Sequence, residues 1–274
     1  EWQQYHDRVT TLDEFIRQRD KIISAIVAMD ADVIGLMEIE NDGYDEYSAI
    51  ADLVSGLNSV PGGATYAFID PGIAPVGTDE ITVGMIYKTD AVTPLGTAVL
   101  VDPSFTDPLN YGDQQSRPAL AQTFMGKATG GVFTVAVNHL KSKSCYDYAS
   151  GDDEDLGDGQ SCFNETRTLG AQALVNWLAT DPTGSDDEDF LVIGDLNSYA
   201  MEDPIIAIED TGYTNLVKTF AGLEAYSYIF DGLSGYLDHA LAGASLADEV
   251  TGVTIWHINT DEPSVIDYNT EYKP

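Results

Sequence analysis

Helix-spaced and strand-like apolar runs follow one another along the chain. Thr11 and Glu14 have the spacing of a helix-capping box, and the residues after Thr11 place apolar side chains on one helical face. We therefore predict a helix from about residue 11 that buries this face. The apolar stripe consists of Leu12, Phe15, Ile16, Ile22, Ile23 and Ile26.

The rest of the pattern predicts further helices and strands in mixed order. Residues 44–57 are predicted to form a second helix, which a Pro-Gly-Gly run ends. Asn164 is predicted to cap a third helix, and Asp203 followed by Pro204 to begin a fourth. Strands are predicted over residues 32–38, 81–87, 117–124, 132–139 and 190–195.

This order of elements predicts an α/β architecture in one domain. Helices and strands do not alternate as regularly as in a purely parallel sheet, which suits two packed sheets flanked by helices. The chain has 274 residues, 43% of them hydrophobic, which is enough for one large core. No internal repeat, linker or break in composition divides it, so residues 1–274 are predicted to form a single domain.

The run Phe190–Asp195 ends in polar side chains that a buried strand would carry to the edge of a sheet. After Gly194 the chain presents the carboxylate of Asp195 and, two residues later, the carboxamide of Asn197. Burial of a carboxylate is unfavourable unless a metal ion, a donor or water compensates it, so we expect Asp195 at a rim, facing a site. The alternative is an ordinary turn, because Gly-Asp and Asn-Ser are common turn formers.

Two further strand ends favour a site over an ordinary turn. One earlier strand ends at Glu38, and another ends at His139, with Lys141 and Lys143 just beyond it. A structural histidine and solvated loop lysines are the alternative. A metal-assisted phosphate site would use all of these groups: an oxygen ligand for the cation, a carboxylate to activate water, and imidazole and ammonium groups against phosphate oxygens.

Motifs along nearly the whole chain, from about Leu12 to Tyr272, resemble the endonuclease/exonuclease/phosphatase superfamily. This superfamily has the deoxyribonuclease I-like fold, and the motifs are most similar to those of its secreted bacterial deoxyribonucleases. The resemblance implies a four-layer α/β/β/α sandwich, with two mixed, mostly antiparallel sheets flanked by helices. The motifs are LME at 36–38, QSRP at 115–118, NHLKSK at 138–143, IGDLNS at 193–198, YSYIFDG at 226–232 and GYLDHA at 235–240.

The resemblance implies roles for the acidic and amide side chains. Glu38 would bind a divalent cation in the active site, either Mg²⁺ or Mn²⁺. Asp195 would activate or orient the attacking water, and Asn197 would help to position that water or the phosphate. Asp238 resembles the family acid that orients a second catalytic histidine.

The basic side chains are expected on the phosphate. By resemblance, His139 would stabilise charge on the phosphate or assist the leaving group, and Arg117 would contact the same phosphodiester. The chain has only 12 lysines and arginines, and we expect them to be concentrated where the substrate binds. Lys141 and Lys143 are therefore predicted to contact substrate phosphates, together with Arg117.

The second catalytic histidine of the family has no evident counterpart in this sequence. His239 directly follows Asp238, and neighbouring residues on a strand point to opposite faces, so it is a poor substitute. His257 is expected to be structural. The family's first strand, with a metal-proximal asparagine, and its last strand, with a Ser-Asp-His motif, are not found, which suggests a segment of a longer protein. Loss of catalytic activity is the alternative.

The charge of the chain is unusual for a protein that would act on DNA. It has 46 acidic and 12 basic residues, a formal net charge of −34. Such a charge repels nucleic acid at long range, because duplex DNA is a dense polyanion. Divalent cations and the short screening length of salty water would offset this repulsion. We therefore expect a saline setting and poor function at low ionic strength without divalent cations.

The two cysteines, Cys145 and Cys162, bracket a polar segment after the His139 strand. A disulfide between them is predicted, worth roughly 3 kcal/mol by closure of the loop. A disulfide supports export from the cell, and free thiols in a cytosolic enzyme are the alternative. The chain has no apolar run long enough to cross a bilayer and no secretory leader at its N-terminus, so we expect that any leader has been removed.

The segment between the cysteines is rich in acids and glycines. It could wrap a calcium ion, although it lacks the closing glutamate of a helix-loop-helix site. The alternative is a solvated acidic loop tethered by the disulfide. The predicted calcium ligands are Asp152, Asp153, Asp155 and Asp158.

The sequence as a whole predicts a secreted, metal-dependent phosphodiester hydrolase. An extracellular nuclease that binds and hydrolyses DNA as a monomer fits the motifs best. One alternative is a phosphomonoesterase or a phospholipid phosphodiesterase on the same fold. Another is a non-catalytic acidic module that binds cations or partners. Four aromatic residues are expected in the core, with one tyrosine at the rim as an alternative: Tyr226, Tyr228, Phe230 and Tyr236.

Overall fold

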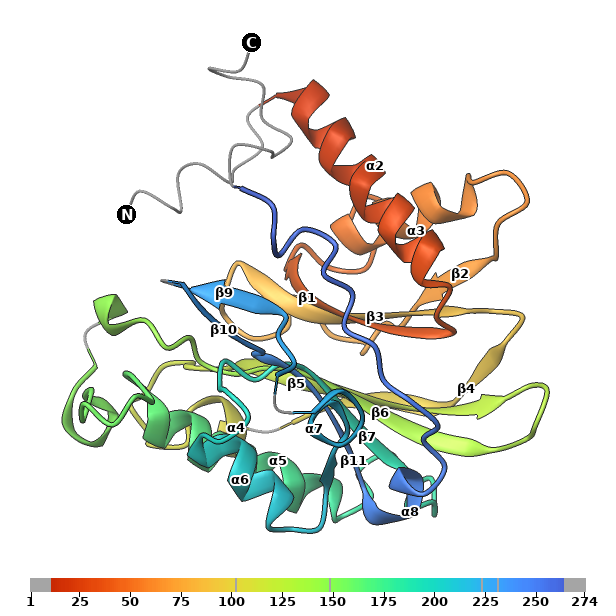
Figure 1. The fold of residues 1–274 in the computed structure, drawn as a ribbon. Helices are drawn as coiled ribbons and strands as arrows, with labels where there is room; N and C mark the ends of the chain where they lie inside the picture. The colour runs from red at the N-terminus through yellow and green to blue at the C-terminus, as the bar shows by residue number, and fades with distance from the viewer. Residues whose placement is uncertain (1–10, 102, 148, 223, 231, 264–274) are drawn as a thin grey trace.

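Two β-sheets pack face to face, with helices on their outer faces (Figure 1). This architecture, seen in a computed structural model, confirms the predicted α/β sandwich. The structure describes residues 11–263 except residues 102, 148, 223 and 231. The prediction about the family's first and last strands falls on the chain ends, residues 1–10 and 264–274, which lie outside the described residues.

The larger sheet carries most of the predicted strands. Its strand order is β4-β5-β6-β7-β11-β8. β6 and β7 are parallel, and the other neighbours are antiparallel, so the sheet is mixed as expected. The strands are β4 (Val92–Leu100), β5 (Arg117–Gly126), β6 (Val132–His139), β7 (Phe190–Asp195), β8 (Thr214–Asn215) and β11 (Asp238–Ala242).

The smaller sheet is antiparallel and has the strand order β1-β3-β2. Among the described strands, β1 is therefore at an edge of this sheet. A separate hairpin, β9 with β10, lies outside both sheets. These strands are β1 (Val33–Glu40), β2 (Tyr66–Phe68), β3 (Ile81–Lys88), β9 (Tyr228–Phe230) and β10 (Leu233–Gly235).

Helices cover the outer face of each sheet. α2 (Leu12–Met29) and α3 (Ala49–Asn58) cover the smaller sheet, and α4, α5 and α6 cover the larger one (Figure 1). In the described part of the chain, no helix combines the length and apolar character needed to span a membrane. The remaining helices are α4 (Pro103–Thr106), α5 (Asn164–Leu178), α6 (Asp203–Glu209), α7 (Leu216–Ala221) and α8 (Ala244–Ala247), with short 3₁₀ turns η1 (Cys145–Asp147) and η2 (Gly151–Asp153).

The capping residues explain where the helices begin. The Thr11 and Glu14 side chains form the predicted capping box at the start of α2. α3 begins later than the predicted residue 44, because the Ser48 hydroxyl accepts the Ala51 N–H and so caps the helix at Ala49.

Two predicted caps are shifted by one residue. Asn164 is the first residue of α5 rather than its cap, which is Phe163 in a left-handed conformation with φ of 62°. Asp203 is likewise the first residue of α6, and Glu202 occupies the cap position. Pro204 remains in the first turn of α6, where its missing N–H has no helical partner to lose.

The apolar stripe of α2 is only partly buried. Ile23 and Ile26 pack with α3 and the smaller sheet. The prediction was wrong for the first half of the helix, where Leu12 is 72% exposed. That half of the stripe finds no covering layer among the described residues. Phe15, Ile16 and Ile22 are also exposed.

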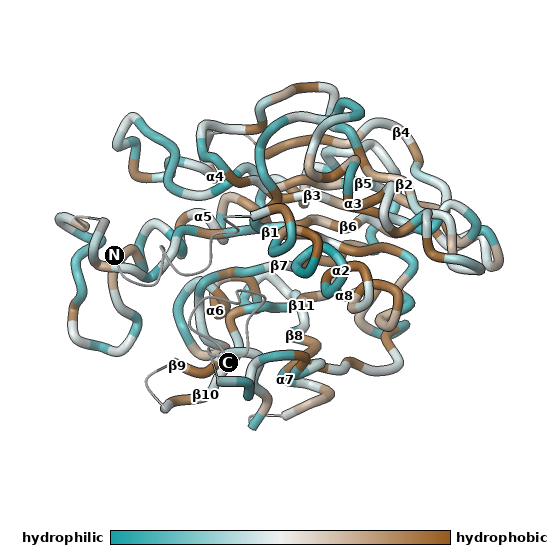
Figure 2. The backbone as a smooth tube through the Cα atoms, turned by 90° about the horizontal axis from the view of Figure 1, so that it is seen from above, coloured by the Kyte–Doolittle hydropathy of each residue, from teal (hydrophilic) through white to brown (hydrophobic). Residues whose placement is uncertain are grey.

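Three apolar clusters separate the four layers of the sandwich. One lies between α2, α3 and the smaller sheet, one between the two sheets, and one between the larger sheet and helices α5 and α6. Seen from above, hydrophobic segments concentrate on the central strands, and hydrophilic ones lie mainly in peripheral loops (Figure 2). Central members of the three clusters are Ile26 and Ile86, Met85 and Phe124, and Leu174 and Val192.

β1 of the smaller sheet packs closely against β6 and β7 of the larger one at Gly35. A Cβ atom on Gly35 would lie 2.8 Å from Cδ1 of Ile193 and 2.9 Å from Cγ2 of Val137. Real Cβ atoms do not tolerate such contacts, so the spacing of the sheets here depends on a residue without a side chain. Gly35 stands three residues before Glu38 on the same strand.

The aromatic residues near β9 and β10 are not the predicted core cluster. Tyr236 is buried, but Tyr228 is 41% and Phe230 52% exposed. The core prediction was wrong for these two, because their strand pairs only with β10 in a hairpin outside both sheets. Their rings are nearly parallel, with centroids 6.2 Å apart and an interplanar angle of 10°.

Candidate active site

Arg117, His139, Asp195 and Asp238 occupy one row across four neighbouring strands of the larger sheet. Arg117 on β5 is the register partner of His139 on β6, which pairs with Asp195 on β7. Asp195 in turn is the register partner of Asp238 on β11. Register partners on adjacent strands point to the same face of a sheet. Side chains from four separate motifs are therefore brought together at one end of the sheet.

His139 is a buried, neutral imidazole in the middle of this row. Its side chain is 4% exposed, and its Nε2 lies 3.6 Å from Oδ2 of Asp195. Burial, with a further contribution from the positive charge of Arg117, lowers the pKa of His139 to about 4. Nδ1 has no hydrogen-bond partner among the described residues. At neutral pH the ring can therefore donate or accept one proton but carries no charge.

Asp195 is a carboxylate that is poorly stabilised in its charged form. Burial raises its pKa to about 7, and repulsion from Asp238 and Glu38 adds to that effect. The backbone N–H of Asn197 donates to Oδ1 over 2.8 Å and acts in the opposite direction, as does the charge of Arg117. Asp195 is thus poised to exchange a proton near neutral pH.

Glu38 faces this row from the smaller sheet. The pairing of β1 with β3 is irregular between Leu36 and Ile39, and Glu38 has a positive φ of 59°. Such a bulge redirects a side chain that regular pleating would point elsewhere. The predicted metal ligand therefore lies at a local distortion of the strand, across from Asp195.

The carboxylates suit a divalent cation that keeps part of its water shell. Both Asp238 and Glu38 disfavour the charged form of Asp195, and a cation would relieve this repulsion. Across the described residues, no three or more Asp, Glu, His or Cys side chains converge closely enough to form a ready cage. Mg²⁺ typically uses one or two carboxylates and retains several waters. Glu38, whose charge acts on Asp195, is the residue that would hold such a cation.

Arg117 is held in the row by an acid that the sequence did not indicate. Its guanidinium lies 2.8 Å from Oδ2 of Asp79, a residue in the loop before β3. The Arg117 side chain is 16% exposed, and its Nε has no partner among the described residues. Contact with a phosphate, as predicted, would add a second anion to this guanidinium.

Asn197 ties the loops after β6 and β7 together. Its backbone is in the left-handed region, with φ of 46°. While its N–H binds Asp195, its side-chain Nδ2 donates to the carbonyl of Leu140 over 3.0 Å. Asn is one of the few residues with a side chain that tolerates this conformation. The turn that first drew attention in the sequence is therefore part of the site.

Asp238 does not orient either of the other described histidines. Its carboxylate accepts a hydrogen bond from Ser227 Oγ over 3.0 Å, and partial desolvation by its surroundings raises its pKa although the residue reaches solvent. His239 is buried, and its Nε2 lies 2.7 Å from the carbonyl oxygen of Ser198. His257 contacts the carbonyl oxygen of Tyr226 instead. Both therefore have structural partners outside the row, as expected.

Both predicted phosphate lysines are engaged by protein groups. The Lys143 ammonium forms an ion pair with both oxygens of Glu202, and it lies 5.2 Å from the ring centroid of Tyr199. Burial lowers the pKa of Lys143, although Glu202 partly offsets this effect. Lys141 Nζ lies 4.5 Å from the ring centroid of Phe163. Neither lysine stands in the row.

Cys145 and Cys162 form the predicted disulfide. The acidic segment that it closes does not gather its acids around a common point. Asp153 is fully buried and accepts hydrogen bonds from the Thr166 N–H and hydroxyl and from the Tyr111 hydroxyl. The calcium prediction is therefore corrected, because Asp153 binds the first turns of α5 instead. Asp155 and Asp158 accept N–H groups within their own turns, and Asp152 is exposed.

The sequence profile of the Endonuclease/Exonuclease/phosphatase family matches residues 10–261. The chain belongs to this family. Membership confirms the resemblance to the endonuclease/exonuclease/phosphatase superfamily, and with it the predicted class of phosphodiester hydrolase. Enzymes of the family generally use divalent metal ions, which agrees with the carboxylates on β1 and β7. Among proteins with curated functions, none matches the chain in sequence.

Solved structures of the Endonuclease/Exonuclease/phosphatase family share the fold at low sequence identity. The human Nocturnin catalytic domain with bound sulfate has 17% identity and a TM-score of 0.55, covering 83% of this chain and 74% of that one. A mannosyl-6-phosphatase of Bacteroides thetaiotaomicron has 15% identity and a TM-score of 0.56, covering 85% and 79%. D. rerio TDP2 with a single-strand DNA product has 12% identity and a TM-score of 0.53, covering 86% and 79%.

Proposed function

We propose that the chain is a secreted, metal-dependent nuclease that hydrolyses DNA in a saline extracellular environment. The row of Arg117, His139, Asp195 and Asp238, facing Glu38 across the sandwich, carries this proposal. The row combines a guanidinium, a neutral imidazole and desolvated carboxylates. Those are the groups that hydrolysis of a phosphodiester requires: charge neutralisation, hydrogen bonding to the phosphate and removal of a proton from water.

Each residue of the row has a role that follows from its environment. Asp195, with its pKa raised to about 7, takes a proton from the attacking water. The Asn197 N–H fixes the orientation of that carboxylate. His139 donates a hydrogen bond to a phosphate oxygen, and Arg117 supplies a positive charge beside it. A divalent cation held at Glu38, Mg²⁺ or Mn²⁺, would supply Lewis-acid stabilisation of the phosphate charge.

Three observations favour nucleic acid as the substrate. The motifs resemble those of secreted bacterial deoxyribonucleases, and the structurally similar TDP2 was determined with a single-strand DNA product. The exposed rings of Tyr228 and Phe230 offer faces on which bases stack. Their hairpin borders the row, because Ser227 binds both Asp238 and the Gly235 carbonyl.

Two further features support secretion. The Cys145–Cys162 disulfide is typical of proteins that fold in an oxidising compartment. The formal charge of −34 suits a salty medium, where screening limits self-repulsion and repulsion from DNA.

Plasmid DNA tests the proposal directly. We expect the purified chain to cleave it with Mg²⁺ or Mn²⁺, and the Asp195→Asn variant to lose about a thousandfold in rate, because its general base is gone. Asp248→Asn, at an exposed position directly after α8, is the matched control. Cleavage that survives Asp195→Asn would contradict the assignment. Sphingomyelin and nitrophenyl phosphate, tested in parallel, identify a phospholipid phosphodiesterase or a phosphomonoesterase activity if DNA is not cleaved.

A further inference from the structure

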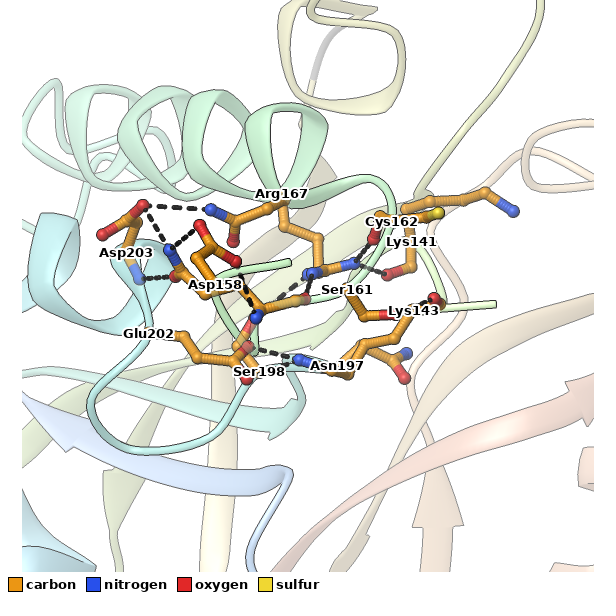
Figure 3. A network of polar contacts seen from close by, with 12 residues as sticks. Lys141, Lys143, Asp158, Ser161, Cys162, Arg167, Asn197, Ser198, Glu202 and Asp203 are labelled. Carbon is orange, nitrogen blue, oxygen red and sulfur yellow. Dashed lines mark hydrogen bonds and ion pairs between the residues drawn. The ribbon is translucent and has the colours of Figure 1, made fainter. Parts of the chain in front are cut away.

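Arg167 on α5 is a charged side chain with no exposure to solvent. Its guanidinium donates to the carbonyl oxygens of Cys162 over 2.8 Å, Gln160 over 2.9 Å and Lys141 over 3.5 Å (Figure 3). Its Nε donates to Ser198 Oγ over 3.2 Å. Burial lowers the pKa of Arg167 to about 10, so it remains charged at neutral pH. None of these acceptors is a carboxylate.

The acceptors belong to three segments that are distant in the sequence. Lys141 follows β6, Ser198 follows β7, and Gln160 and Cys162 end the disulfide-closed segment. A planar guanidinium can bind several convergent carbonyls at once, whereas an ammonium acts as a single point charge. Arg167 thus joins the two loops beyond the catalytic strands to the segment between the cysteines.

Arg167 lies on the buried stripe of α5, in line with Ala171, Leu174 and Leu178. Removing a charge from water costs several kcal/mol per ion. An apolar side chain here would avoid that cost but would leave three backbone carbonyls and the Ser198 hydroxyl without their donor. The explanation for a charged residue on this stripe therefore lies in what its acceptors hold in place.

Its contact with Ser198 supplies that explanation. Ser198 is fully buried and is held from two sides, by Arg167 at Oγ and by His239 at the carbonyl oxygen. The preceding residue, Asn197, is in the left-handed region, and its side chain donates to the Leu140 carbonyl from this turn. This same residue donates its N–H to the Asp195 carboxylate.

We propose that Arg167 is a positioning residue, which holds the Asn197–Ser198 turn and thereby the orientation of the Asp195 carboxylate. It also fixes the disulfide-closed segment to this turn. Arg167 donates no hydrogen bond to the row itself, and its charge acts on Asp195 only at longer range, a charge that Arg167→Lys retains. The inference rests on the proposed function only in assuming that Asp195 takes part in hydrolysis.

Substitutions at Arg167 test the inference through the separation of kcat from KM. Arg167→Met and Arg167→Lys are each expected to lower kcat on a short DNA substrate by about a hundredfold, the effect of misplacing a catalytic group by about 1 Å. KM should change less than about threefold, since no substrate contact is lost. Arg167→Lys should not retain the wild-type kcat, because one ammonium group cannot replace the several N–H donors of the guanidinium. Arg19→Met and Arg19→Lys are the matched controls. Arg19 lies on α2 and pairs with Asp52 on α3, outside the segments that Arg167 joins.

Ser198→Ala provides a second variant that leaves the Arg167 contacts to backbone carbonyls in place. We expect it to lower kcat by about tenfold and to add little to the effect of Arg167→Met, because both remove one interaction. Wild-type kcat in Ser198→Ala or in Arg167→Met, with only a lower melting temperature, would overturn the proposal and leave Arg167 a purely structural residue.

A measurement without substrate separates this inference from the proposed function. Hydrogen–deuterium exchange at the Asn197 amide, which is bound to Asp195, should speed up by at least tenfold in Arg167→Met and stay unchanged in Arg19→Met. If the wild-type chain does not cleave DNA but Arg167→Met still shows the faster exchange at Asn197, the proposed nuclease function is contradicted and the positioning role is supported. Unchanged exchange at Asn197 would overturn the positioning role whatever the activity.

Discussion

His139 and Asp195 face each other at the ends of two parallel strands, with imidazole Nε2 3.6 Å from carboxylate Oδ2. Burial acts on them in opposite directions on the pH scale. It lowers the pKa of His139 to about 4 and raises the pKa of Asp195 to about 7. Between these two values, and without a cation, the pair is neutral. Above pH 7 only the carboxylate is charged.

The raised pKa of Asp195 predicts that the contribution of this residue to the stability of the metal-free protein falls as pH rises. A folded-state pKa above the unfolded value stabilises the protein below the unfolded pKa, and that contribution disappears as pH rises through about 7. The contribution of Asp195 should fall by about 4 kcal/mol between pH 4 and 7.5. Urea unfolding in EDTA at several pH values measures this change as the difference between the wild type and Asp195→Asn.

The Asp195→Asn variant should lack this part of the pH dependence, because its carboxamide does not titrate. Millimolar Mg²⁺ should also reduce it in the wild type, since a cation favours the charged carboxylate. Identical pH dependence in the two proteins would show that Asp195 is not destabilised in its charged form.

His239 predicts a loss of stability in acid. Burial lowers its pKa to about 4, so its contribution is complete above the ordinary histidine value and is lost as pH falls through about 4. The loss should approach about 3 kcal/mol between pH 6.5 and pH 4. Unfolding of His239→Gln across this range should show a smaller dependence on pH. His257→Gln, at an exposed position, is the control and should follow the wild type.

Gly194 predicts that the row depends on close contact between β6 and β7. Its φ is 131°, and a Cβ atom would lie 2.0 Å from the carbonyl oxygen of Asn138. Gly194→Ala should separate the strand ends that carry His139 and Asp195. We expect a loss of about 2–4 kcal/mol in unfolding free energy and of most hydrolytic activity. Gly252→Ala, where a Cβ meets nothing within 4 Å, should leave both unchanged.

The net charge of −34 predicts an unusual salt dependence. At about 0.01 M salt the screening length is about 30 Å, and it falls to about 8 Å at 0.15 M. Plasmid cleavage at fixed Mg²⁺ should therefore accelerate with added NaCl over this range, because repulsion between protein and DNA is screened. A small phosphodiester whose leaving group carries no charge serves as the control. Its rate of hydrolysis should depend only weakly on added NaCl. A plasmid rate that falls steadily with salt would contradict the prediction.

The strand ends were predictable because each joins an apolar run to a functional side chain. His139 and Asp195 could be located in this way, and the capping box of Thr11 marked the first helix. The alignment of the row could not be predicted, since register between strands depends on contacts across the sheet. The partner of Arg117, Asp79, belongs to a loop with no pattern of its own.

The errors have a common physical cause, which is that burial depends on neighbours distant in sequence. Tyr228 and Phe230 look like core residues, yet their hairpin stands apart from both sheets. Asp153 looks like a calcium ligand, yet it binds Thr166 and Tyr111 in the interior. Arg167 did leave a signal, because it is a charged residue on the apolar stripe of α5.

Glu38 and the His139–Asp195 pair stand on different sheets, so the separation of the sheets affects the width of the active site. Gly35 permits close approach where β1 meets Val137 and Ile193. One methyl group added at Gly35 would push the two sheets apart. It would move Glu38 away from His139 and Asp195 without contacting any of the three. The size of phosphoester that the site accepts therefore depends on buried residues between the sheets that do not contact the substrate.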